Sequence, residues 1–123
     1  MENNKQYFLR ELLNQAPDDS YWSIEGLYDA RSKQTLSAFF VDAHACAGEG
    51  DYCISLTKEN KKDLLSLLTD NDITHDMVHC SLFKDGQRLM DSYDFFMTNV
   101  FYVDFVDDGF KQYCLENEFT EFK

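Results

Sequence analysis

The 123-residue chain carries 23 acidic and 11 basic side chains, a formal net charge of −12 at pH 7. Such a surface repels phosphates and anionic lipid headgroups, so the composition argues against a nucleic-acid or membrane partner. With 44% hydrophobic residues, 11 Phe and one Pro, residues 1–123 have the inventory of a single folded domain and not that of a disordered acidic chain.

The N-terminal segment does not have the basic region followed by an apolar run that marks a secretory signal. The apolar runs elsewhere are much shorter than the roughly 20 residues that span a bilayer. We therefore expect a cytoplasmic protein. Its four cysteines, Cys46, Cys53, Cys80 and Cys114, are expected to be reduced and buried as small apolar side chains, with a disulfide or a metal site as the less favoured alternative.

The first half of the chain predicts one helix and three strands. Residues 3–16 have a helical stripe of apolar side chains and end before Pro17. Residues 20–29 alternate around Trp22 and Ile24 as a strand, in which Gly26 indicates a bulge or a close approach. Residues 30–34 are expected to form a turn, 35–43 a partner strand, and 52–56 a third strand.

The second half begins with a helix, for which Thr57 is a favourable N-cap and the leucines at 64, 65, 67 and 68 provide an apolar face. Residues 77–83 alternate as a strand, and Asp85-Gly86 is a strong hairpin signal because glycine tolerates a positive φ. Residues 88–96 then return as the antiparallel mate. Residues 100–106 are the last predicted strand, and Asp107 or Asp108 caps a closing helix.

The predicted order is therefore α-β-β-β-α-β-β-β-α. Consecutive strands joined by short turns favour an antiparallel sheet with helices packed on it. We expect a single α+β domain over residues 1–123.

Motifs for catalysis or metal binding are weak. His44, Cys46 and Cys53 offer zinc donors, but a structural zinc site needs four ligands. His75 and His79 have i, i+4 spacing without the glutamate of an HExxH motif. We therefore predict no catalytic residue, metal or cofactor, and we expect a protein that is not an enzyme.

The negative charge is concentrated near the C-terminus. Residues 91–123 contain eight acidic and two basic side chains, a net charge of −6, and rings alternate with carboxylates along them. Strand periodicity alone would produce this alternation, with rings facing a core and acids facing water. Tyrosines beside carboxylates also suit a surface that receives Arg and Lys side chains. The predicted partner-binding residues are Asp91, Tyr93, Asp94, Tyr102, Asp104, Asp107 and Asp108.

The chain resembles the immunity proteins of bacterial polymorphic toxin systems, including contact-dependent growth inhibition. The resemblance lies in small size, acidity and α+β layout, and in the segments Trp22–Gly26, Phe39–Ala43 and Gly48–Ile54. It implies a monomer that binds a cognate basic toxin domain, often a nuclease, in a one-to-one complex and blocks its active site or substrate groove.

Other functions stay open. Type III secretion chaperones are similar in size, acidity and element order, and such a homodimer would wrap an extended effector segment. A phosphate-mimicking inhibitor of a DNA-binding protein would use the same negative charge. An enzyme with a metal site at His44, Cys46 and Cys53 would need stoichiometric bound zinc.

Overall fold

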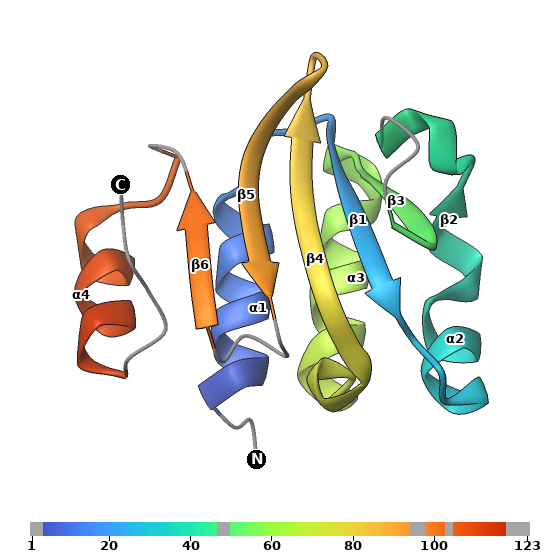
Figure 1. Ribbon diagram of the computed structural model, residues 1–123, viewed down its shortest axis with the longest axis horizontal. Helices are drawn as coiled ribbons and strands as arrows, with labels where there is room; N and C mark the ends of the chain where they lie inside the picture. The colour runs from blue at the N-terminus through green and yellow to red at the C-terminus, as the bar shows by residue number, and fades with distance from the viewer. Residues whose placement is uncertain (1–3, 47–49, 94–97, 103–104, 118–123) are drawn as a thin grey trace.

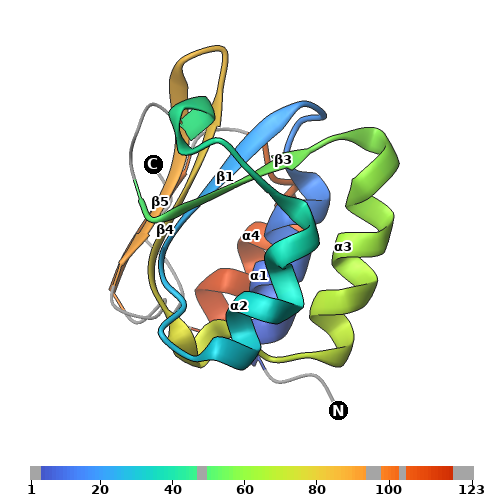
Figure 2. The ribbon, with the colours of Figure 1, turned by 90° about the vertical axis from the view of Figure 1, so that its right-hand side faces the viewer.

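The computed structural model describes residues 4–46, 50–93, 98–102 and 105–117. Within these residues an antiparallel sheet of six strands has the order β2-β3-β1-β4-β5-β6, and four α-helices lie together on one side of it (Figures 1 and 2). This arrangement confirms the predicted α+β class. The elements are α1 (Asn4–Gln15), β1 (Ser20–Gly26), α2 (Ala30–Leu36), β2 (Phe40–Val41), β3 (Tyr52–Leu56), α3 (Lys58–Asp70), β4 (Met77–Lys84), β5 (Gln87–Tyr93), β6 (Thr98–Tyr102) and α4 (Asp108–Glu116).

The connection between β1 and β3 differs from the prediction. Residues 30–36 form the helix α2 where a turn and the start of a strand were expected, and the predicted strand 35–43 shrinks to the two residues of β2. Asp29 begins the helix because its carboxylate accepts the Arg31 N–H at 2.8 Å. Ser32 and Leu36, four residues apart, bury one helix face.

Three predicted local signals are confirmed. Thr57 caps α3 and forms a capping box with Asn60, each side chain accepting the other residue's backbone N–H. Asp85 and Gly86 turn the β4–β5 hairpin with φ values of 52° and 77°. Asp107 caps α4, and its carboxylate accepts the Phe110 N–H at 2.8 Å.

The Thr57 cap provides a first prediction. Replacing Thr57 with Ala removes the acceptor for the Asn60 N–H and is expected to cost about 1 kcal/mol of unfolding free energy. Urea unfolding followed by circular dichroism measures it. The control is Thr69→Ala, an exposed site in the last turn of α3 where alanine is the better helix former, with an expected change near zero. Equal effects of the two substitutions would contradict the capping role.

The main core lies between the helices and the sheet (Figure 2). Trp22 and Ile24 point from β1 into this core, and Phe8 and Leu12 of α1 are fully buried against it. α4 joins the same layer, since the rings of Phe8 and Phe110 stack with centroids 5.7 Å apart. None of the described helices combines the length and the apolar character needed to cross a membrane.

The bend after β1 fixes where that strand ends. The β1–β4 register shifts between Glu25 and Gly26, which confirms the irregularity expected at Gly26. The Leu27 N–H donates to the backbone carbonyl of Asp76 at 2.8 Å. The buried Asp76 carboxylate accepts the backbone N–H groups of Tyr28 and Asp29 at 3.1 and 2.9 Å. One residue thus ties the strand end to the start of α2.

Candidate functional site

The face of the sheet opposite the α-helices is the part of the fold where a site can form. Side chains alternate across a strand, so the β1 residues next to Trp22 and Ile24 face away from the main core. No α-helix among the described residues covers this second face (Figure 2). A short 3-10 turn, η2 (Ala43–Cys46), packs on part of it through Cys46, whereas Glu25 on the same face is exposed.

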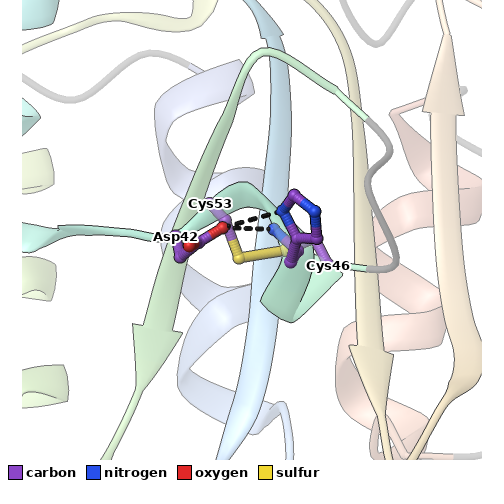
Figure 3. The surroundings of a disulfide bond; sticks show 4 residues. Asp42, Cys46 and Cys53 are labelled. Carbon is purple, nitrogen blue, oxygen red and sulfur yellow. Dashed lines mark hydrogen bonds and ion pairs between the residues drawn. A yellow bond between two sulfur atoms is a disulfide. The ribbon is translucent and has the colours of Figure 1, made fainter.

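Beneath η2 lies a small second core. A disulfide there joins η2 to β3 (Figure 3). Cys46 and Cys53 are bonded with their Cα atoms 6.1 Å apart, and they pack with Phe83 and Tyr21. The expectation of four reduced cysteines is therefore wrong for this pair. The sequence does not predict this disulfide, because the pairing depends on η2 folding back over Cys53. Local sequence patterns do not indicate that contact.

The two remaining cysteines agree with the expectation: Cys80 and Cys114 are buried and neither belongs to a disulfide. Burial raises the pKa of the Cys80 thiol to about 12, which the neighbouring Trp22 side chain partly opposes and the charge of Asp91 reinforces. A thiol with this pKa is almost entirely protonated at neutral pH, so Cys80 is a poor nucleophile.

This assignment gives a second prediction. In the folded protein no thiol should react rapidly with Ellman's reagent, because both are buried, whereas two should react in denaturant without reductant. Mass spectrometry of the alkylated, unreduced protein identifies them as Cys80 and Cys114. A thiol that reacts rapidly in the folded protein, or four thiols in denaturant, would contradict the assignment.

The zinc candidates do not assemble. The sulfurs of Cys46 and Cys53 are bonded to each other and are not thiolate ligands. The ring of His44 contacts the Asp42 carboxylate at 3.0 Å, and the backbone N–H and ring of His44 hold the pKa of that carboxyl below its usual value. Across the described chain, no group of three or more His, Cys, Asp or Glu side chains is placed to hold a metal ion.

Beside the second core, the open sheet face has a hollow of about 360 Å³. It lies over three neighbouring strands: Glu25 of β1 pairs with His79 of β4, and Ser81 of β4 pairs with Asp91 of β5. We call it the sheet hollow. Its lining residues are Glu25, Gly50, His79, Cys80, Ser81, Arg88 and Asp91.

Charged side chains are anchored on the β5 side of the sheet hollow. The Asp91 carboxylate accepts hydrogen bonds from the Ser81 hydroxyl and from the guanidinium of Arg88. That guanidinium also lies 5.0 Å from the centroid of the Phe83 ring. Only 15% of the Asp91 side chain is exposed, so this pair is held partly out of water and is screened less by salt than a surface pair.

The predicted partner-binding residues do not form one surface. Asp91 lies in the sheet hollow, whereas Asp107 and Asp108 begin α4, which packs with α1 on the other side of the sheet. Asp94 and Asp104 lie outside the described residues. Tyr93 ends β5, and Tyr102 pairs with Met90 in β6, but the side chains of these two tyrosines also lie outside what is described.

Sequence reasoning missed the other residues of the sheet hollow. The alternation within each strand was visible, and it places His79 and Ser81 on one face of β4. What the alternation does not reveal is that β1 lies between β3 and β4, which brings Glu25 opposite His79.

A second hollow, of about 320 Å³, lies between α2 and the C-terminal end of α3. Two of its three carboxylates have structural tasks: Asp29 caps α2, and Asp72 accepts hydrogen bonds from the backbone N–H and the hydroxyl of Thr74. The third, Asp70, ends α3. The sheet hollow is the better candidate because it is larger and holds a carboxylate, Asp91, that is fixed by Ser81 and Arg88 without capping a helix.

Comparison of the chain with protein-family models, with curated proteins and with solved structures finds no match.

Proposed function

We propose that the chain is an acidic binding protein whose partner is a basic protein domain. The observation that carries the proposal is the net charge of −12, on a fold in which no α-helix of the described residues covers one face of the sheet. Such a field accelerates capture of a positively charged partner and disfavours nucleic acid and anionic membranes. Tyr21, half-buried on the same face, is of a residue type enriched among the anchors of protein interfaces.

The specific role proposed is that of an immunity protein, which neutralises a cognate toxin domain by covering its active site or substrate groove. Small size, acidity and an α+β fold support it, and the toxin in this proposal is a basic domain such as a nuclease. The complex is one-to-one, and the chain needs neither catalytic residues nor a cofactor for this task.

The proposed compartment is the cytoplasm. Glutathione there opposes the Cys46–Cys53 disulfide, so in this proposal the pair is a dithiol in cells and forms the disulfide of the structure once the protein is isolated in air. Disulfides persist instead in oxidising compartments. Alkylating the thiols in intact cells before lysis tests the point. A free Cys46–Cys53 dithiol supports the cytoplasm, and a disulfide trapped in cells moves the protein to an oxidising compartment.

Affinity capture followed by a neutralisation assay tests the function. The tagged chain is expected to capture one basic domain in equimolar amount, more rapidly at about 0.05 M than at about 0.5 M NaCl. Co-expression should then rescue cells from the captured domain's toxicity. A dimer holding an extended effector would favour the chaperone instead, and a captured domain whose activity is unchanged would contradict the immunity role.

Two charge reversals locate the interface. Glu25→Lys changes the open sheet face, and Asp108→Lys makes the same kind of change at the exposed start of α4. If the partner docks on the open face, Glu25→Lys lowers the association rate constant and the affinity more than Asp108→Lys does. A larger loss of association rate and affinity in Asp108→Lys would instead place the interface at the C-terminal acidic residues.

A further inference from the structure

The sheet hollow has carboxylate oxygens that no part of the described chain uses. Both hydrogen bonds to Asp91, from Ser81 and Arg88, go to its Oδ1 atom, so Oδ2 accepts none from the described residues. Glu25, on the opposite side, has no ion pair or side-chain hydrogen bond within the described structure. Its side chain is exposed at the rim of the hollow.

The cationic side chain of Arg88, which lines the hollow, already has partners within the chain. Arg88 donates to Asp91 and Ser81 and lies over the Phe83 ring, which holds its guanidinium on the β5 side. Counting Glu25, Asp91 and Arg88, the formal net charge of these side chains of the hollow is −1. The surrounding chain, at −12, adds to that negative potential.

A single cationic side chain complements this arrangement. An incoming guanidinium provides five N–H donors in a planar fork, which matches two carboxylates better than the compact ammonium of lysine does. A hollow of about 360 Å³ has room for one such group, and the low exposure of Asp91 strengthens its attraction for a cation.

We propose that the sheet hollow is the receptor for one arginine side chain of the partner, bound by the Glu25 carboxylate and by Oδ2 of Asp91. This inference rests on the proposed function and deepens it, because it names the chemical group by which a basic partner is anchored. Arg88 and Ser81 act as positioning residues, because both donate to Oδ1 of Asp91 and leave Oδ2 without a donor among the described residues.

The test is a titration followed by NMR, using the blocked peptide acetyl-Gly-Arg-Gly-amide as probe. We expect saturable shifts of the His79, Ser81 and Gly50 amides with a dissociation constant on the order of 10 mM. The same peptide with citrulline in place of arginine has nearly the same shape without the charge, and it should cause no saturable shift.

Two variants make the test specific. Glu25→Gln removes one carboxylate from the hollow and should raise the dissociation constant of the arginine peptide at least about fivefold. Glu59→Gln makes the same change on α3, on the helix side, and should leave the titration unchanged. The inference is wrong if the shifts do not saturate, if citrulline binds as well as arginine, or if the two variants behave alike.

The outcome separates this inference from the proposed function. A basic partner that is captured and neutralised by the Glu25→Gln variant with undiminished affinity would overturn the arginine receptor and leave the immunity role standing. Arginine-specific peptide binding, together with no captured basic partner, would support the arginine receptor and contradict the immunity role.

Discussion

Replacing Gly26 with Ala is expected to lower the free energy of unfolding by about 4 kcal/mol or more. The residue has a φ of +121°, which L-amino acids rarely adopt. A Cβ atom there would lie 2.6 Å from the backbone oxygen of Asp76 and 2.9 Å from the backbone nitrogen of Val78. Both obstacles are main-chain atoms at the junction of η3 (Thr74–Asp76) and β4, so they cannot move aside as a flexible side chain would.

The matched control is Gly86→Ala in the β4–β5 turn. Gly86 also has a positive φ, of 77°, but nothing lies within 4 Å of an added Cβ. Its substitution should cost only about 1 kcal/mol, the conformational penalty alone. Thermal and urea unfolding of the two variants measures the difference. If Gly26→Ala is no more destabilising than Gly86→Ala, the close approach of β1 to the η3–β4 junction is wrong.

The same bend matters for the sheet hollow. Glu25 precedes Gly26 and is the last β1 residue in register with β4 before the shift. A side chain at position 26 would push the end of β1 away from β4 and move Glu25 from its place opposite His79. We therefore expect a folded Gly26 variant to lose the arginine-peptide response along with stability.

Local signals predicted the elements that local interactions determine. The cap at Thr57 and the turn at Asp85-Gly86 each depend on a few neighbouring residues, and both are where the sequence places them. Strand β3 was also predicted with its observed bounds, because its apolar run lies between a glycine-rich segment and the Thr57 cap.

The errors lie where distant parts of the chain decide the structure. The apolar pair Phe39-Phe40 predicted a long strand, but Asp29 begins a helix just before it and only β2 remains. The predicted strand 100–106 is observed as Thr98–Tyr102. Most of the candidate site was beyond sequence reasoning, because the Cys46–Cys53 pair and the Glu25–His79 register both depend on which strands become neighbours.

Replacing Asp76 with Ala is the second substitution with a large expected effect, about 3 kcal/mol of unfolding free energy. The carboxylate satisfies the backbone N–H groups of Tyr28 and Asp29, one with each oxygen, and is itself buried. Removing it leaves both partly buried N–H groups without their acceptor. Asp76→Asn, which retains one carbonyl oxygen, should lose roughly half as much.

The control for Asp76 is Asp63→Ala, the same chemical change at an exposed position of α3, expected within about 0.5 kcal/mol of the unsubstituted protein. Hydrogen exchange locates the effect, since the amides of Tyr28 and Asp29 should lose protection first in the Asp76 variant. Uniform loss of protection would indicate general destabilisation. A loss of unfolding free energy no larger than that of Asp63→Ala would contradict the stabilising role of the Asp76 carboxylate. A selective loss at this bend would show that a carboxylate 47 residues away in sequence from Asp29 holds the strand end that presents Glu25 to the sheet hollow.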